Sequence, residues 1–270
     1  MAALRGTMGR MCGRYATTMD PETLYGIFDA EPDPVALPGT GLYGGDLPRP
    51  RYNIAPTDTV PVVRVRPHRG DEPATRFVGE ARWGLVPSWA KDLSVGSRMF
   101  NARAESVPGK AAFRTAFERR RCLLPASGYY EWEKLGADGA APRGKARKQA
   151  YFITPQDGSV MAFAGLWEFW RAPDGAPVVS TTIITTEAPE PMTRIHDRMP
   201  LVLPASEWAP WLDPSIPGDE LLGMLSPPSA DLVRALELRP VGPAVGNVRN
   251  DSADLVAAVA AEVAAAPRSQ

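Results

Sequence analysis

Short apolar runs and alternating apolar and polar positions recur along most of this chain, and both patterns are typical of β-strands. β-branched residues fill nearly all of 178–186, which favours a buried position in a sheet. A polar turn separates 59–66 from 74–83, so these two segments are predicted to form a hairpin. Strands or extended segments are predicted at 13–18, 59–66, 74–83, 99–105, 122–132, 151–154, 160–169, 178–186, 201–203 and 236–241.

Helices are fewer and shorter. Asp20-Pro21-Glu22 has the N-cap, first-turn proline and first-turn acid of a helix start, and Leu24, Ile27 and Phe28 follow on one predicted apolar face. Further helices are predicted at 111–120, 206–212 and 219–225, and by propensity in the Ala-rich tail, whereas 31–50 and 134–149 are predicted loops. Because strands outnumber long helices, we expect an α+β fold: one domain around a curved, mostly antiparallel, barrel-like β-sheet with peripheral helices.

The composition allows one large core, since 44% of the 270 residues are hydrophobic and 23% are charged. No apolar run is long enough to cross a bilayer, so we expect a soluble, cytoplasmic protein with no membrane contact. The formal net charge of -1 excludes a generally basic nucleic-acid-binding protein. A role with nucleic acid would therefore depend on local groups of Arg and Lys.

Cysteine and histidine are rare. The two cysteines, Cys12 and Cys122, are too few for a disulfide framework and fit a reducing cytoplasm. The two histidines, His68 and His196, form no zinc-ligand spacing with them, and we expect neither a metal nor a cofactor.

Cys12 directly follows Met11, which suggests that it can become an N-terminal cysteine, a residue able to trap aldehydes. If the chain starts at Met11 and this methionine is trimmed, Cys12 carries an α-amine and a thiol that titrate near about pH 8 and 8.5. An aldehyde forms an imine with such an amine, and the neighbouring thiol closes a thiazolidine ring. We therefore expect residues 1–11 to be a leader that is absent or removed. The alternative is that Cys12 is a small, inert residue inside a strand.

Three polar residues stand in otherwise apolar or extended segments, and each has a structural alternative. Asn101 would serve as a turn cap, Glu131 as the solvent-facing member of an alternating strand, and His196 as a satisfied core histidine. A histidine of near-neutral pKa suits general acid–base chemistry, and a partly desolvated carboxyl group suits proton transfer to and from an amine.

Two further segments have the composition of a nucleic-acid groove. Pro56 keeps the residue before it extended, which stiffens the segment that includes Asn53. Trp83 and Trp89 bracket a segment with Gly and Pro. They are open to two interpretations of equal weight, core packing or stacking on unpaired bases.

The order of the short motifs is more specific than any one of them. They are Met-Cys-Gly-Arg-Tyr, Arg-Tyr-Asn-Ile-Ala-Pro-Thr, Trp-Gly-Leu-Val-Pro-Ser-Trp, Asn-Ala-Arg-Ala-Glu, Gly-Tyr-Tyr-Glu-Trp, Ile-His-Asp-Arg-Met-Pro and Val-Gly-Asn-Val-Arg-Asn. The series resembles the SRAP family, the SOS response-associated peptidases or abasic-site processing proteins. The resemblance predicts an SRAP domain at 12–250 and leaves 251–270 as an Ala-rich tail.

This resemblance implies a DNA-protein crosslinking protein of the SOS and DNA damage response, with associated autopeptidase (hydrolase) and lyase-type activities. Its N-terminal Cys would form a covalent thiazolidine with a ring-opened abasic sugar in single-stranded DNA and so shield the lesion. The implied catalytic residues are Cys12, Asn101, Glu131 and His196, and the implied DNA-binding residues are Arg14, Asn53, Pro56, Trp83, Trp89 and Arg103.

The partner expected from the resemblance is single-stranded DNA with abasic sites, bound by a monomer that is nucleoid-associated while on DNA. A self-processing cysteine peptidase, with His196 as the base for Cys12, is the main alternative. A non-catalytic single-strand-binding protein is a third hypothesis. It would bind intact and abasic strands equally and release both on denaturation.

Overall fold

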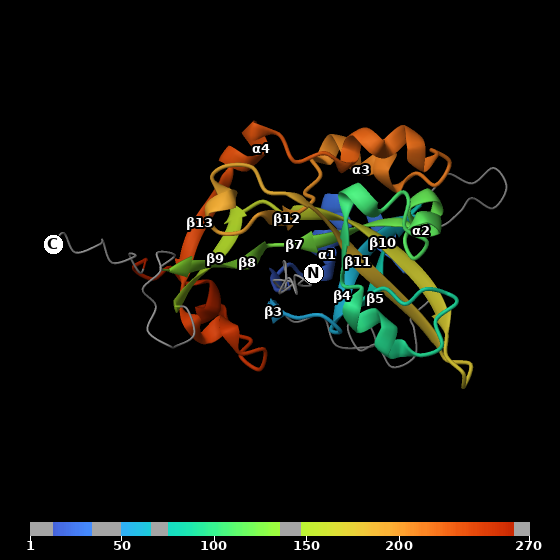
Figure 1. The fold of residues 1–270 in the computed structure, drawn as a ribbon, viewed down its shortest axis with the longest axis horizontal. Helices are drawn as coiled ribbons and strands as arrows, with labels where there is room; N and C mark the ends of the chain where they lie inside the picture. The colour runs from blue at the N-terminus through green and yellow to red at the C-terminus, as the bar shows by residue number, and fades with distance from the viewer. Residues whose placement is uncertain (1–12, 34–49, 66–74, 136–146, 262–270) are drawn as a thin grey trace, which may run out of the picture.

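The computed structural model describes residues 13–33, 50–65, 75–135 and 147–261, and their strands fall into two sheets (Figure 1). The smaller sheet has the order β13-β9-β8-β1-β3. Its strands are β1 (Tyr15–Thr17), β3 (Arg51–Ile54), β8 (Gly128–Leu135), β9 (Arg147–Pro155) and β13 (Leu236–Val241). The eight-stranded sheet comprises β2 (Ala30–Pro32), β4 (Thr59–Val65), β5 (Arg76–Trp83), β6 (Asn101–Arg103), β7 (Arg121–Ala126), β10 (Met161–Arg171), β11 (Pro177–Glu187) and β12 (Arg198–Pro200).

The larger sheet closes on itself. Antiparallel pairs join β11, β10, β7, β4 and β5 in that order, and β5 then pairs in parallel with β11 through Arg82↔Ser180 and Trp83↔Thr181. This closure confirms the predicted α+β fold around a curved, barrel-like and mostly antiparallel sheet. The predicted hairpin is also present as β4 and β5, while its turn lies outside the described residues.

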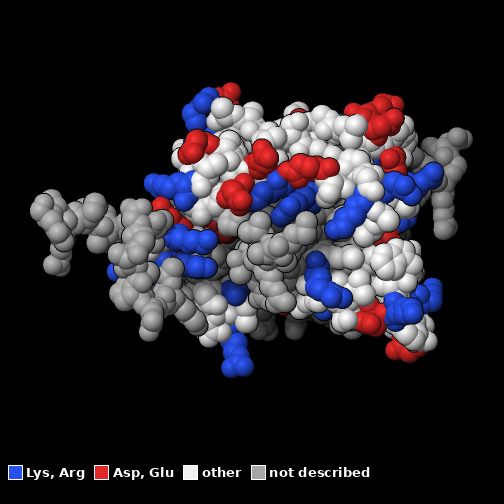
Figure 2. Space-filling model, viewed as in Figure 1, with Lys and Arg blue, Asp and Glu red and all other residues white. Residues whose placement is uncertain are grey.

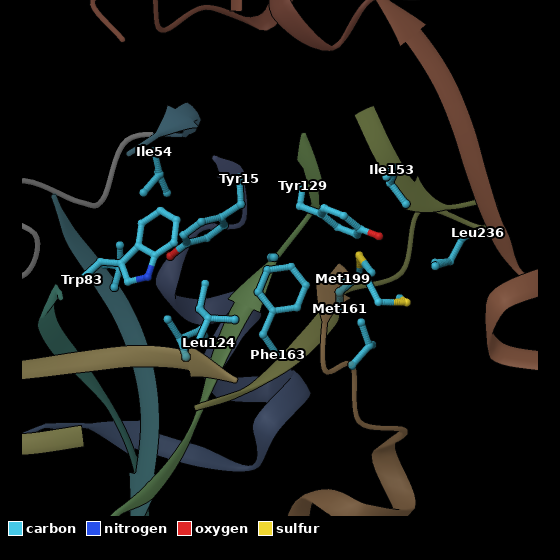
Figure 3. Close-up of a cluster of buried hydrophobic side chains, with 14 of the residues drawn as sticks. Tyr15, Ile54, Trp83, Leu124, Tyr129, Ile153, Met161, Phe163, Met199 and Leu236 are labelled. Atoms are coloured by element: carbon cyan, nitrogen blue, oxygen red, sulfur yellow. The ribbon is translucent and has the colours of Figure 1, made fainter. Parts of the chain in front are cut away.

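A continuous hydrophobic core joins the two sheets. Tyr15 of the smaller sheet meets Trp83 and Phe163 of the larger one in edge-to-face contacts, with ring centroids 5.3 and 5.9 Å apart. Figure 3 shows these rings converging with aliphatic and methionine side chains from both sheets. Burial of this much aromatic surface stabilises the sheets against each other.

Helices pack against both sheets, and those after residue 229 lie against the smaller one. The α-helices are α1 (Pro21–Phe28), α2 (Arg114–Arg119), α3 (Ala205–Leu212) and α4 (Ala230–Arg234), and the 3-10 helices are η1 (Leu93–Arg98), η2 (Ala104–Ser106), η3 (Met192–Arg194), η4 (Gly218–Leu225), η5 (Pro243–Gly246) and η6 (Ala253–Val256). Asp20 caps α1 as predicted, since its Oδ1 accepts from Thr23 N at 2.8 Å. Leu24 and Phe28 are buried, but Ile27 is 40% exposed, so the predicted apolar face was too wide.

The extended run predicted at 122–132 is in fact two strands in different sheets, β7 and β8. The chain changes sheet at Ser127, whose N–H donates to Ala16 O of β1. Gly128 makes this crossing possible, because a Cβ there would lie 2.5 Å from the Phe152 ring and 2.6 Å from Ile153 O. The crossing brings Glu131 into the smaller sheet, beside β1.

Other expectations were wrong in part. Part of the loop predicted at 31–50 is strand β2, which pairs in parallel with β5, although 34–49 lie outside the described residues. The predicted tail helix is only the short η6 within the described part of the tail. There Val241 bridges Ala258 and Val259 N donates to Pro240 O at 2.9 Å, so pairing with β13 overrides alanine's helix propensity. None of the helices in the described ranges combines the length and apolarity needed to span a membrane.

Candidate functional site

Strand β1 leads the start of the described chain along β8. Tyr15 pairs with Tyr129 and Ala16 with Gly128 in antiparallel register, and Tyr130 N donates to Arg14 O at 3.0 Å. Followed backwards, β1 therefore runs towards Glu131. Cys12 precedes Gly13 in the sequence and lies outside the described residues.

Glu131 is a carboxylate in a largely apolar setting. It is 3% exposed and lies directly opposite Tyr151 of β9, which places both side chains on the same face of the smaller sheet. That face packs into the core between the sheets, where Tyr129 and Ile153 are also buried. Burial raises the pKa of Tyr151, and a hydrogen bond with Glu133 raises it further. A carboxylate held in such surroundings is suited to proton transfer.

The segment that carries His196 is docked on this same face. Met192 and Ile195 are buried in the inter-sheet core. Arg194 lies over the Tyr151 ring, with Cζ 5.7 Å from the ring centroid, and its Nε is 3.7 Å from Glu133 Oε1. Tyr151 is the direct neighbour of Glu131 on the adjacent strand, so these contacts place the segment that carries His196 next to β8.

The ring of His196 is oriented by its own loop. Its Nδ1 accepts from Arg198 N at 3.0 Å and lies 2.9 Å from Asp197 Oδ1. When Nδ1 accepts the backbone N–H, the proton of the neutral ring is on Nε2, and a second proton at Nδ1 would face the Asp197 carboxylate. The side chain of His196 is 21% exposed, so the ring is fixed but reachable.

Strand β11 pairs with both the strand that carries Asn101 and the strand that follows His196. Its Ile183 pairs with Asn101 of β6, and its Thr185 pairs with both Arg103 of β6 and Pro200 of β12. Arg103 is exposed. Two motifs quoted from the sequence therefore flank the same end of one strand.

A partly buried ion pair fastens these flanking segments together. Arg198 donates to both carboxylate oxygens of Glu105, and to Thr185 O at 2.6 Å. Hydrogen bonding from Arg198 lowers the pKa of Glu105. Sequence reasoning missed both residues, although Glu105 ends the Asn-Ala-Arg-Ala-Glu motif and Arg198 belongs to Ile-His-Asp-Arg-Met-Pro.

The two candidate tryptophans have different environments. Trp83 is 0% exposed, its Nε1 donates to Phe100 O at 2.8 Å, and it packs against Tyr15, so the core-packing interpretation applies. No face of this indole is left for a base to stack on. Trp83 was expected among the DNA contacts, and its burial does not fit that expectation. Trp89 is 64% exposed and Pro56 is partly exposed, so both remain accessible to a ligand.

Asn53 is also buried, at 1% exposure, and its amide serves an internal role. Its Oδ1 accepts from Arg14 Nη1 at 2.9 Å, and its Nδ2 donates to carbonyls of the segment after β13. Arg14 also donates to Val245 O at 2.7 Å, and burial lowers its pKa. This geometry supports a positioning role for Asn53 towards Arg14.

The basic side chains form separate groups rather than one patch on the face in Figure 2. That distribution agrees with the net charge of -1. Within the described residues, no group of three or more His, Cys, Asp or Glu is arranged to hold a metal ion.

A cleft of about 850 Å³ lies elsewhere, between α1, α3 and the end of β9. Met19, Trp208 and Leu232 are among its lining residues, and none of the candidate residues lines it. The candidate site is therefore not this cleft.

Sequence comparison identifies relatives along nearly the whole chain. A family model described as "SOS response associated peptidase (SRAP)" matches residues 11–248. The chain is 36% identical over 248 residues to the Abasic site processing protein YoaM of Bacillus subtilis, covering 91% of this chain and 97% of that protein. It is 28% identical over 268 residues to the Abasic site processing protein HMCES of Xenopus tropicalis, covering 92% and 78% respectively.

Solved structures share the fold. A protein from Bacteroides thetaiotaomicron superposes with a TM-score of 0.73 at 21% identity, over 92% of this chain and 100% of that one. A protein from Bordetella bronchiseptica superposes with a TM-score of 0.64 at 26% identity, over 86% of this chain and 100% of that one.

Proposed function

The chain belongs to the SRAP family (SOS response associated peptidase), and on this premise we propose that it captures abasic sites in single-stranded DNA as covalent adducts of Cys12. The relatives named abasic site processing proteins support the lesion as substrate. The proposal includes loss of residues 1–11, so that Cys12 becomes the N-terminal residue. The start of the family match at residue 11 supports this boundary.

The observation that carries the proposal is the pairing of β1 with β8. This register directs the chain back from Ala16 towards Glu131, and Cys12 is joined to the first described residue of that segment. The docking of the His196 segment on the same sheet face supports a shared site. In this proposal Glu131 and His196 supply the two proton-transfer groups of the site.

The proposed chemistry begins with the opening of the abasic sugar to its aldehyde. The α-amine of Cys12 adds to C1′ and gives a carbinolamine, which loses water to form an imine. The thiol sulfur then adds to the imine carbon while its proton passes to the nitrogen, closing the thiazolidine. Aldehyde, amine and thiol thus give one ring and one water, and no oxidant or metal is consumed.

Each polar residue has a role in this sequence. His196 exchanges a proton with the sugar as its ring opens, using Nε2 because Nδ1 is engaged by Arg198 N. Glu131 takes a proton from the attacking amine and returns one to the departing hydroxyl. Asn101 orients the sugar hydroxyl or the adjacent phosphate. Arg14 and Arg103 neutralise phosphates.

Exposed residues on the rim would hold the rest of the strand. Trp89 offers an accessible indole for stacking on an unpaired base, and Pro56 offers a stiff apolar edge. We propose that the protein acts as a cytoplasmic monomer on chromosomal DNA and that the adduct shields the lesion from strand cleavage.

The test is denaturing electrophoresis of protein that begins at Cys12 after incubation with an abasic single-stranded oligonucleotide. We expect a heat-stable adduct that Cys12→Ala abolishes. Cys122→Ala is the matched control, since Cys122 is 0% exposed and burial raises the pKa of its thiol to about 12. Full adduct yield in Cys12→Ala would discard the mechanism.

A peptidase function has one observation in its favour, the description of the matching family. In this alternative the Cys12 thiol, with His196 as base, cleaves the leader from the chain. Intact-mass measurement on purified, protease-free protein that retains residues 1–11 would test it. Release of the leader there, and its retention in Cys12→Ala, would support self-processing.

A further inference from the structure

The turn that follows β13 contributes little to the core, yet many hydrogen bonds hold it in place. Val245 is buried, whereas the next four residues are exposed, and Val248 reaches 53% exposure at the tip. Arg249 is among the exposed residues. A turn with so little buried surface usually has few restraints on its conformation.

This turn is nevertheless fastened by a buried amide. Nδ2 of Asn53 lies 3.2, 3.0 and 2.8 Å from the carbonyl oxygens of Val245, Asn247 and Asn250, so its two N–H groups are shared among these three acceptors. Asn53 is 1% exposed, so these bonds form where water competes poorly. The amide therefore fixes the path of the turn at its beginning, middle and end.

Asp251 fastens the end of the same turn to β3. Its Oδ1 accepts from the backbone N–H groups of Tyr52 and Asn53 at 2.6 and 3.1 Å, and its Oδ2 accepts from Arg51 Nε at 2.5 Å. Charge-assisted bonds of this kind are stronger than neutral ones. The backbone that carries Val248 and Arg249 is thus held from both sides.

The turn also contacts Arg14, which directly precedes β1. Arg14 Nη1 donates to Val245 O at 2.7 Å, and Arg14 Nη2 lies 3.4 Å from Gly246 O. Arg14 follows Cys12 by two positions in the sequence. Arg14 contacts the turn and Arg249 is part of it, while the nearby carboxylates of Asp58 and Asp251 both bind Arg51.

We propose that the 246–250 turn is a further DNA contact, in which Arg249 binds a backbone phosphate of the lesion strand and Val248 packs against the neighbouring unpaired base. This inference rests on the proposed function and extends it to a second element. A guanidinium on a pre-fixed backbone loses less conformational freedom on binding phosphate than one on a loose loop. The buried Asn53 then acts as the positioning residue for Arg14 and the turn together.

The test separates binding from crosslinking. Adduct formation by protein that begins at Cys12 is followed against the concentration of abasic single-stranded DNA. Arg249→Ala should raise the half-saturating concentration about fivefold and leave the maximal rate unchanged. It should also reduce the slope of log affinity against log salt by about 0.7, the value for one phosphate on a single strand.

Arg119→Ala is the matched control. Arg119 is an exposed arginine of α2, which lies at the right of Figure 1, whereas the red segment after β13 lies at the lower left. We expect this control to match the unchanged protein in both affinity and salt slope. An Arg249→Ala protein that also matches it would overturn the inference.

A second measurement remains informative if the proposed function fails. In the Cys12→Ala background, anisotropy of an undamaged fluorescent single strand reports binding without any crosslink. Arg249→Ala should again weaken binding about fivefold, and Val248→Ala about twofold. Absence of an adduct in the unchanged protein would defeat the proposed function, whereas equal affinities in these variants would defeat the role of the turn.

Truncated oligonucleotides test the geometry of the contact. With the abasic site near the 5′ end in one strand and near the 3′ end in the other, the Arg249→Ala penalty should disappear with only one of them. A penalty that persists with both, or is absent from full-length strands, contradicts a phosphate contact on one side of the lesion.

Discussion

Two tryptophans of one short motif lie in opposite kinds of environment. Trp83 is enclosed between the two sheets at 0% exposure, and Trp89 stands in a loop at 64% exposure. The same division separates Asn53 and Glu131, which are buried, from Arg103, which is exposed. Membership of a motif therefore does not determine how a residue acts.

The buried region sets geometry, and the exposed region meets the ligand. Trp83 connects Tyr15 of β1 with Phe100, the residue before Asn101, through a ring contact and a hydrogen bond. It can thus relate two parts of the site without contacting DNA itself. Mutations in the buried region should reduce stability or chemistry, while mutations in the exposed region should reduce affinity alone.

The largest expected effect is on stability. Trp83→Ala should lower the free energy of unfolding by about 3–5 kcal/mol, because it empties a fully buried ring site and removes the bond to Phe100 O. Denaturant unfolding measures this loss. Trp89→Ala is the internal control and should change the free energy by no more than about 0.5 kcal/mol. Similar losses in the two variants would refute the division.

Glu131→Gln should leave stability nearly unchanged and slow adduct formation about 100-fold, since the amide keeps the shape of the carboxylate but cannot accept and return the proton. Single-turnover kinetics on an abasic strand measures the rate. Glu133→Gln, two positions further on the same face, should slow it only a few-fold. Unchanged rates of both formation and reversal in Glu131→Gln would remove Glu131 from the site.

Local signals in the sequence predicted much of the fold. The cap at Asp20 and the polar turn expected between 59–66 and 74–83 are signals that act over a few residues, and helix α1 and the paired strands β4 and β5 were confirmed. The break between β7 and β8 was missed because it depends on close approach of Gly128 to β9. The short η6 in place of a tail helix likewise depends on pairing with β13, which helix propensity does not include.

The candidate site shows the same limit. Ordered motifs pointed to Asn101, Glu131 and His196, whereas the bonds that hold their segments together join residues far apart in sequence. Asn53 Nδ2 reaches a carbonyl 192 residues further along the chain, and Arg198 reaches Glu105 across 93 residues. Such partners are brought together only by the sheets, so no local pattern marked them.

On the exposed side, Trp89→Ala should weaken binding of an undamaged single strand about fivefold, because stacking on an aromatic ring contributes roughly 1–3 kcal/mol per base. Fluorescence anisotropy measures the dissociation constant, and the maximal rate of adduct formation should stay the same. Trp89→Phe should retain much of the affinity. If Trp89→Ala instead lowered the maximal rate with unchanged affinity, Trp89 would act in the reaction itself. The division between buried residues that set geometry and exposed residues that bind the ligand would then be wrong.

The smallest effect concerns the ion pair that joins the two flanking segments. Hydrogen bonding from Arg198 lowers the pKa of Glu105, so this carboxylate stabilises the fold above its unfolded-state pKa, and the contribution disappears as the pH falls through the lower folded-state pKa. Glu105→Gln should therefore lose stability at neutral pH and differ less from the unchanged protein below about pH 4. Because the Glu105 side chain is 52% exposed, the loss should be about 1 kcal/mol or less, measured by unfolding at several pH values. A Glu105→Gln deficit that stays constant from pH 7 to pH 3 would show that the ionised carboxylate contributes nothing to holding the histidine and asparagine segments together.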